Sequence, residues 1–213
     1  MNIVLLGPPG TGKGTIAQFI SERFGCVHVS TGDLLREQVA RKTDTGKKIE
    51  PIMNSGQLVS DEIVLNVLKL KLSGIGTRFI LDGFPRTLEQ GELLEPILSE
   101  LDISLNVVLE IYSSDDIIVK RLSARRQCTL CKRIYGLDVP SKEPGICDDC
   151  QGSTILRDDD KPDVVMKRLK LYKDVTEPLV DFYTKKGLLV KIDGNRYLQE
   201  IFKGVEKVLH EFE

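Results

Sequence analysis

Short apolar runs separated by amphipathic segments recur along the whole chain. Ile3–Leu6, Phe79–Leu81 and Leu188–Val190 are runs of this kind. Apolar runs without polar alternation are typical of strands that are buried on both faces of a sheet. In the segments between them, apolar residues return every three or four positions, as in Ile63–Leu68. This spacing predicts helices that pack one face against the sheet.

The expected strands and helices alternate from one end of the chain to the other. The strands are expected at residues 3–6, 25–29, 79–82, 105–111 and 188–192, and a closing amphipathic helix at 198–212. Such alternation predicts an α/β fold, namely a five-stranded, doubly wound parallel sheet with helices on both faces. Two polar segments interrupt the alternation, residues 30–59 and 123–159. We expect both to be inserted lids.

The loop after the first strand carries the strongest chemical signal. Gly7–Gly12 holds three glycines, and Lys13 opens a segment with helical periodicity. Glycines let the backbone curve so that its N–H groups point inward, and the helix N-terminus and the lysine add positive charge. This context predicts a phosphate-binding loop, or P-loop. The usual pattern has Ser or Thr directly after the lysine, whereas Gly14 follows here and Thr15 supplies the hydroxyl.

The expected strand at residues 79–82 ends in a carboxylate, Asp82. An aspartate at the carboxyl end of a strand beside a P-loop is well placed to hold Mg²⁺ through water. The plainer interpretation of the same residue is a cap of the next turn. Gly83–Arg86 then brings an arginine to the same edge of the sheet.

Four of the five cysteines form two Cys-x-x-Cys pairs. Paired thiols at this spacing are a strong signature of a tetrahedral zinc site, which four thiolates would close to water. Two disulfides are the alternative, which a reducing compartment disfavours. The segment between the pairs is too short and polar for an apolar core, so a structural metal would hold it together. The four candidate ligands are Cys128, Cys131, Cys147 and Cys150.

Composition excludes some other classes of function. The 213 residues include 30 Lys and Arg and 32 Asp and Glu, so the net charge is −2. This balance gives no sign of binding to nucleic acid or to an anionic membrane. The sequence opens directly on a strand, without a signal peptide, and no apolar run reaches the length of a membrane span. We therefore expect a cytoplasmic protein.

Four stretches, in this order and spacing, closely resemble the motifs of adenylate kinases. They are Gly7–Thr15, Ser30–Arg36, Gly56–Asp61 and Asp82–Gln90. The resemblance extends over the whole chain and includes the cysteine-bearing insert, as in the long form of the family with a zinc-binding lid. It implies MgATP + AMP ⇌ 2 ADP, with lid closure excluding water. It also implies a monomer that acts on ATP, AMP and ADP, without nucleic-acid or membrane partners.

The resemblance assigns residues to each substrate. ATP would be bound by Gly10, Thr11, Gly12, Lys13, Gly14, Thr15, Arg121 and Arg125. AMP would be bound by Thr31, Arg36, Gln57, Leu58, Val59, Gly83, Arg86, Gln90, Arg157 and Arg168, with Gln90 reading the adenine edge. The residues acting on the transferred phosphoryl group would be Lys13, Arg86, Arg121, Arg125, Arg157 and Arg168. Asp158 and Asp159 resemble the acidic pair that holds the closed lid.

The same resemblance suggests a division of the chain into three parts. The core P-loop domain would comprise residues 1–29, 60–122 and 160–213, the AMP-binding lobe 30–59, and the zinc-binding lid 123–159. The lid departs from the family pattern at two places. Ala124 stands where a glycine usually precedes the lid arginine, and the chain reads Asp138–Lys142 where the family has an Asn-Pro-Pro run.

The chemistry of phosphoryl transfer agrees with these residues, because it requires positioning and charge neutralisation more than covalent catalysis. Arginine suits this role, since its planar fork binds phosphate at two points. The alternatives are another nucleoside monophosphate kinase (for UMP, CMP or GMP), an ATP-dependent switch, and a zinc-ribbon nucleic-acid binder. An acidic net charge and only 6% aromatic residues argue against the last of these.

Overall fold

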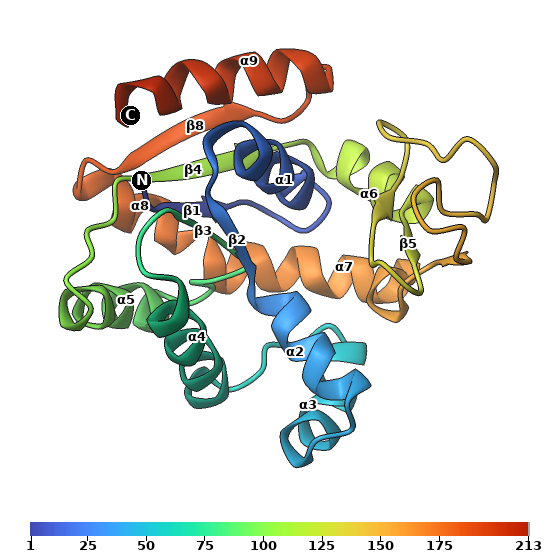
Figure 1. Ribbon diagram of the computed structural model, residues 1–213, viewed down its shortest axis with the longest axis horizontal. Coiled ribbons are helices and arrows are strands. Elements are labelled where there is room, and N and C mark those ends of the chain that lie inside the picture. Colours follow the sequence, from blue (N-terminus) through green and yellow to red (C-terminus); the bar gives the residue numbers. More distant parts are fainter. Residues whose placement is uncertain (213) are drawn as a thin grey trace.

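The structure is a computed structural model, and it describes residues 1–212. Its centre is a parallel five-stranded sheet with strand order β2-β3-β1-β4-β8 (Figure 1). The strands are β1 (Ile3–Leu6), β2 (Val27–Ser30), β3 (Phe79–Asp82), β4 (Val107–Tyr112) and β8 (Leu189–Asp193). The expected doubly wound α/β fold is thereby confirmed.

The two faces of the sheet have separate apolar cores, because successive residues of a strand point to opposite sides. In β1, Ile3 and Leu5 belong to a core with helices α1 and α9, whereas Val4 and Leu6 belong to a core with α4, α5 and α8. A strand covered on both faces must be apolar throughout, which explains the uninterrupted run. These helices are α1 (Lys13–Phe24), α4 (Asp61–Ile75), α5 (Leu88–Glu100), α8 (Pro178–Lys185) and α9 (Leu198–Leu209).

The strand order places the P-loop at the point where the chain changes direction across the sheet. β1 pairs with β3 on one side and with β4 on the other, and the loop follows its last residue. In this register Leu5 of β1 is paired with Asp82 of β3. The carboxylate at the end of β3 therefore lies level with the start of the loop, at the strand ends where open α/β sheets bind ligands.

Two segments project from this core. Residues 30–59 form the helices α2 (Thr31–Ala40) and α3 (Asp44–Asn54). The cysteine-bearing insert carries a small antiparallel sheet of order β6-β5-β7, which the sequence did not predict because strands this short show no hydrophobic alternation. Its elements are β5 (Arg126–Cys128), β6 (Ile134–Tyr135), β7 (Thr154–Ile155) and the 3-10 turn η1 (Asp158–Asp160).

Helices α6 (Asp115–Ala124) and α7 (Pro162–Leu171) connect the insert to the core. The π-helical segment η2 (Tyr172–Thr176) follows α7, and the 3-10 turn η3 (His210–Phe212) follows α9. Helix α8 begins at Pro178, since proline suits the first position of a helix. Among residues 1–212, no helix is both long and apolar enough to cross a membrane.

Candidate active site

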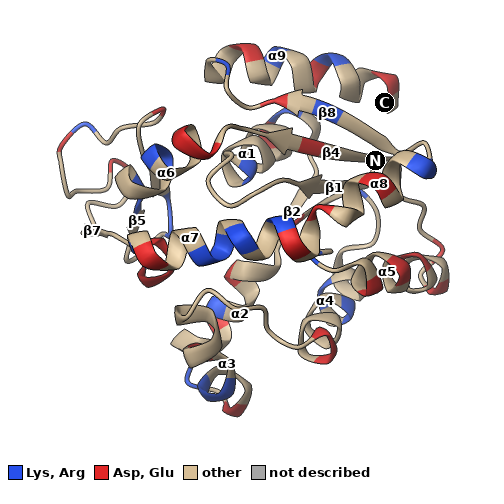
Figure 2. Cartoon of the chain, turned by 180° about the vertical axis from the view of Figure 1, so that it is seen from behind, with Lys and Arg blue, Asp and Glu red and all other residues tan. Residues whose placement is uncertain are grey.

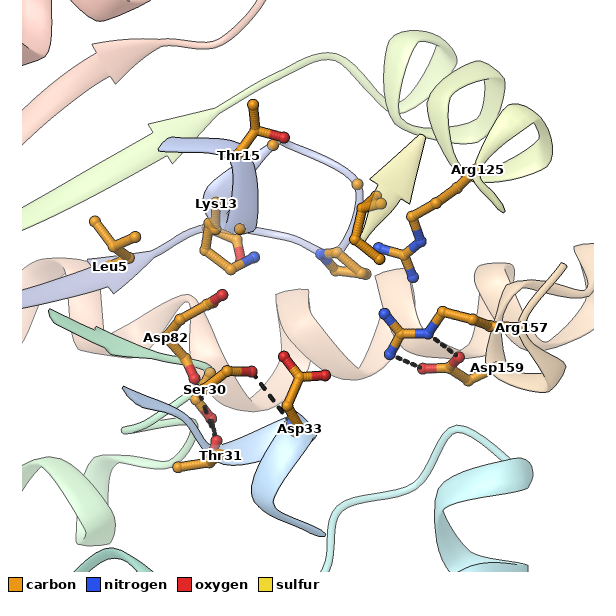
Figure 3. A pocket seen from close by; sticks show the side chains of 18 of the residues that line it. Leu5, Lys13, Thr15, Ser30, Thr31, Asp33, Asp82, Arg125, Arg157 and Asp159 are labelled. Atoms are coloured by element: carbon orange, nitrogen blue, oxygen red, sulfur yellow. Dashed lines mark hydrogen bonds and ion pairs between the residues drawn. The ribbon is translucent and has the colours of Figure 1, made fainter. Parts of the chain in front are cut away.

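One cavity of about 900 Å³ opens at the carboxyl ends of the sheet strands, and it is at the upper end of the size range for ligand sites. Its walls come from the P-loop, α2, residues 56–59, the end of β3, α6, the insert and α7. Figure 3 shows Lys13 and Asp82 on one side of it and Arg125 and Arg157 on the other. The cavity thus unites parts of the chain that lie far apart in sequence.

The P-loop is shaped by glycines in conformations that other residues avoid. Gly7, Gly10 and Gly12 have φ angles of 138°, 87° and 93°. A Cβ on Gly7 would lie 2.2 Å from the carbonyl oxygen of Ile111, so the loop can pack this closely on β4 only without a side chain. Because Gly12 gives α1 no side-chain cap, the first-turn N–H groups of the helix stay free to bind an anion.

Lys13 lies at the centre of the loop. Its ammonium donates hydrogen bonds to the carbonyl oxygens of Gly7 (2.7 Å) and Pro8 (2.8 Å). Burial lowers the pKa of Lys13 to about 8, against the opposing attraction of Asp82. A buried cation without a full counter-charge gains strongly from an anionic ligand.

Most of the expected ATP-binding residues of the loop line the cavity, including Gly14 and Thr15. Thr11 differs, because its side chain is buried and its hydroxyl donates to the carbonyl oxygen of Pro8 at 3.0 Å. The side chain of Thr11 therefore braces the loop from within. A contact of Thr11 with phosphate would have to use its backbone N–H.

Asp82 faces the loop from the end of β3. Its carboxylate lies 3.3 Å from Nε2 of His28 and 3.8 Å from the position of a Cβ on Gly14. Burial alone would raise the pKa of Asp82, but the hydrogen bond with His28 and the charge of Lys13 outweigh it and keep the pKa below its ordinary value. An ionised carboxylate beside the loop fits a water-bridged Mg²⁺. His28 lines the cavity as well.

The expected AMP-binding residues line the cavity as well. Thr31 donates its hydroxyl hydrogen to the carbonyl oxygen of Gly83 (2.8 Å), and Nε of Arg86 donates to the same oxygen (2.7 Å). Burial and repulsion from Arg168 lower the pKa of Arg86 to about 10. Arg36 is held by Asp33 at 2.6 Å. Further lining residues of this set are Gln57, Leu58, Val59 and Gln90.

The arginines of the insert border lie around two carboxylates. Arg168 lies within salt-bridge distance of Asp159 (3.3 Å) and Asp160 (3.1 Å). Burial and repulsion by Arg36 lower the pKa of Arg157 to about 10. Burial would raise the pKa of Asp159, but the charges of Arg168 and Arg157 outweigh it and lower the pKa to about 2. The helices that carry these arginines and their neighbours, α2, α6 and α7, show basic positions in Figure 2.

The acidic pair was assigned one residue too early. Asp158 is exposed and pairs with Lys161 at 2.9 Å, away from the arginine cluster. Asp160, by contrast, is buried and binds Arg125 through both carboxylate oxygens, at 2.6 and 2.5 Å. The pair that holds the arginines is therefore Asp159 and Asp160. Three consecutive aspartates give no sequence signal that distinguishes the buried one.

Arg121 contacts the insert in this structure. Its Nε lies 2.8 Å from the carboxylate of Asp138, and its Nη1 donates to the carbonyl oxygen of Gly194 at 2.8 Å. Asp138 is the residue at which the insert departs from the Asn-Pro-Pro pattern. The departure thus places a carboxylate against one of the expected phosphate-binding arginines.

The four cysteines of the insert form a compact cluster. Their Sγ atoms all lie within 4.8 Å of one another, and two pairs, 128 with 150 and 131 with 147, are 3.4 Å apart. These distances far exceed the bond of about 2.05 Å in a disulfide. In a tetrahedral zinc site with Zn–S bonds of about 2.3 Å, two sulfur atoms lie about 3.8 Å apart. This separation falls within the range of the Sγ–Sγ distances of the cluster. The thiol set therefore fits a tetrahedral metal ion.

The surroundings of the cysteines support this fit. The phenol of Tyr135 donates to Sγ of Cys147 at 3.3 Å, and the backbone N–H of Leu130 donates to Sγ of Cys128 at 3.4 Å. Hydrogen bonds of this kind orient metal-binding thiolates and share their negative charge. Among the described residues, the buried cluster of the insert consists of Cys128, Tyr135 and Cys147, so little apolar packing holds it together.

A family model described as Adenylate kinase matches residues 5–188. The chain belongs to the adenylate kinase family. It is 46% identical over 215 residues to an adenylate kinase of Methanothrix thermoacetophila, with 100% of both chains covered. It is 44% identical over 212 residues to an adenylate kinase of Archaeoglobus fulgidus, with 98% of both chains covered. The resemblance of the sequence motifs is thereby confirmed.

Membership of the adenylate kinase family gives the cavity a consistent interpretation. All the expected AMP-binding residues and all the expected ATP-binding residues except Thr11 line this one cavity. Sequence reasoning missed three residues that contact them, His28, Asp61 and Asp160. Each contacts a residue far away in the sequence, and the sequence motifs do not indicate which distant residues meet.

Proposed function

We propose that the chain transfers the γ-phosphoryl group of ATP to AMP and so forms two molecules of ADP. The observation that carries this proposal is the convergence of the P-loop lysine and the arginines Arg86, Arg125, Arg157 and Arg168 on one cavity. Their burial leaves positive charge that a polyphosphate would neutralise. A reaction that develops charge on phosphate oxygens gains most from such prearranged cations.

Each side of the cavity would have its own task. The free N–H groups at the start of α1 and Lys13 would hold the donor phosphates. Arg86 and Arg36 would hold the acceptor phosphate, and Gln90 the acceptor base. Arg125, Arg157 and Arg168 would close over the transferred group and keep donor and acceptor in line. Because the acceptor phosphate is already an anion, no strong base is required.

A magnesium ion would neutralise phosphate charge when bound with ATP. Asp82 is the residue that would hold it through water, because its carboxylate is ionised and lies beside the loop. The Cys128, Cys131, Cys147 and Cys150 thiolates would hold zinc, whose role is structural since no coordination position stays open.

Two moving parts would exclude water, which competes with AMP as acceptor. We assign residues 30–59 to an AMP-binding lobe, 123–159 to a zinc-binding lid, and 1–29, 60–122 and 160–213 to the core. Arg36 of the lobe lies 3.9 Å from Asp159 at the lid border, which brings the two parts together over the cavity. The resemblance to the adenylate kinase family supports a monomer as the working unit.

Diphosphate formation with each monophosphate tests the proposal. Purified protein with MgATP is expected to convert AMP rapidly and UMP, CMP and GMP far more slowly. Turnover with a different monophosphate would overturn the choice of base but keep the mechanism. ATP hydrolysis that needs no monophosphate would instead favour a nucleotide switch, and neither the family model nor the related adenylate kinases favours that alternative.

Removal of the metal is expected to weaken the lid. Stripping zinc with a strong chelator should lower the melting temperature by at least about 5 °C, because the metal replaces the apolar core that the lid lacks. Metal analysis should find one zinc per chain in the untreated protein and in a Cys26→Ser control, but not in Cys131→Ser. An unchanged melting temperature after verified zinc loss would rule out the structural role.

A further inference from the structure

Asp61 contacts the side chain that is expected to read the acceptor base. Its Oδ1 accepts a hydrogen bond from Nε2 of Gln90 at 2.5 Å. On the other side of the same amide, Oε1 of Gln90 accepts from the backbone N–H of Arg86 at 2.7 Å. Gln90 is only 2% exposed and lines the cavity. Its amide is therefore held at both ends before any ligand binds.

These two partners differ in what they can do. A carboxylate can only accept a hydrogen bond, and a backbone N–H can only donate one. Asp61 consequently requires the NH2 group of Gln90 on its side, and Arg86 requires the oxygen on the other. An amide rotated by 180° would place two donors face to face at Arg86 and two acceptors face to face at Asp61. One orientation of the Gln90 amide is thus strongly favoured.

We propose that Asp61 is a positioning residue for specificity, which fixes the Gln90 amide in the orientation that accepts 6-aminopurine and rejects 6-oxopurine monophosphates. The inference rests on the proposed function, in which Gln90 contacts the acceptor base. After binding Asp61 and Arg86, the amide retains one N–H and one oxygen lone pair for a ligand.

The two classes of purine present inverse hydrogen-bonding patterns at this edge. AMP offers a donor at its 6-amino group and an acceptor at N1. IMP has the same shape but offers an acceptor at O6 and a donor at N1. An amide of fixed orientation can match only one of these patterns, whereas a freely rotating amide can match either. A mismatch leaves buried polar groups unpaired, which makes such sites selective.

Asp61 is itself held in place. It is the first residue of α4, and its Oδ2 lies 3.5 Å from the hydroxyl of Thr87. That hydroxyl caps α5 by accepting a hydrogen bond from the backbone N–H of Gln90 at 3.0 Å. The starts of α4 and α5 are therefore joined through the residues that orient Gln90.

The ratio of kcat/KM for AMP to that for IMP tests the proposal. Asp61→Ala is expected to lower this ratio about tenfold, the value of one hydrogen bond to a charged group, because Arg86 alone then holds the amide. KM for AMP should rise, while KM for ATP stays unchanged. Glu62→Ala is the matched control, since Glu62 is exposed and lies in the same first turn of α4. It should keep the wild-type ratio.

A double-mutant cycle separates positioning from a general structural effect. If Asp61 acts through Gln90, Asp61→Ala should leave the ratio unchanged in a Gln90→Ala background. If the alanine variant does not fold, Asp61→Asn takes its place in the test. The amide of the new asparagine can turn an N–H donor toward Gln90, so it should hold the Gln90 amide less firmly and lower the ratio of kcat/KM about threefold.

An unchanged AMP-to-IMP ratio in both Asp61 variants would overturn the inference, as would a wild-type protein that uses the two equally well. A drop in the ratio that persists without Gln90 would also overturn it. None of these outcomes affects the proposed transfer to AMP, which fails only if the wild-type protein forms no diphosphate.

Discussion

Replacing Lys13 with methionine is expected to lower kcat about a thousandfold. The ammonium is the fixed charge of the P-loop, held by the carbonyl oxygens of Gly7 and Pro8 at the cavity wall, and a water molecule in its place would carry no charge. Removal of one prearranged hydrogen-bond donor from such a site typically lowers kcat by about 10²–10³. Removal of a full charge that contacts phosphate lowers kcat by more. The variant should be measured under saturating ATP and AMP.

The stability of the Lys13→Met variant distinguishes a lost charge from a damaged fold. Because burial lowers the pKa of Lys13 to about 8, below the value of an unfolded lysine, the charged form costs stability at neutral pH. Methionine removes this cost, so the variant should melt at the same or a higher temperature. Lys120→Met, at an exposed site on α6, is the control and should retain wild-type kcat. A Lys13 variant with more than about a tenth of wild-type kcat would contradict this role for the ammonium.

Replacing Asp160 with alanine is expected to destabilise the protein by about 3–5 kcal/mol, because the partly buried Arg125 loses its counter-charge and Arg168 loses one of two. Asp160 has no exposed side-chain surface, and both Arg125 and Arg168 bind it. The melting temperature should fall by about 10 °C for a chain of this size. Turnover should fall too, since both arginines lose the carboxylate that aims them at the cavity.

The neighbouring Asp158 provides a closely matched comparison. Asp158→Ala removes the same group two positions earlier, but from an exposed pair with Lys161, and such pairs contribute at most about 1 kcal/mol. Thermal unfolding of both variants under identical conditions decides the assignment. Equal losses of stability would mean that the buried network around Asp160 does not carry the effect.

The sheet was predictable from sequence because burial on both faces leaves a clear signature. Ile3–Leu6 is apolar throughout for that reason, and the glycines of the P-loop reveal a backbone that only glycine adopts readily. The cysteine cluster was predictable because metal coordination requires four ligands at fixed spacing. In each case one physical requirement acts on residues that are close together in the sequence.

The remaining features depend on contacts between distant segments. The sequence does not indicate that Asp61 would meet Gln90, because nothing in either motif specifies how α4 and α5 pack. A lone histidine in an apolar strand gives no signal of a functional role, and only the register of β2 and β3 brings His28 to Asp82. The lid sheet was missed because its strands are too short to carry a pattern.

The ion pair between Arg125 and Asp160 has a consequence for the evolution of the lid. The chain leaves the core next to Arg125 and returns at Asp160, and the two-point bond between them ties the ends of the excursion together. The energetic cost of closing a loop grows only slowly with its length, so the stability of the core depends little on the length of the segment between these ends. Residues 126–156, which lie between Arg125 and the cavity-lining Arg157, therefore form an exchangeable cassette. A segment of another length, stabilised by apolar packing instead of a metal, could replace it without altering the frame that holds it.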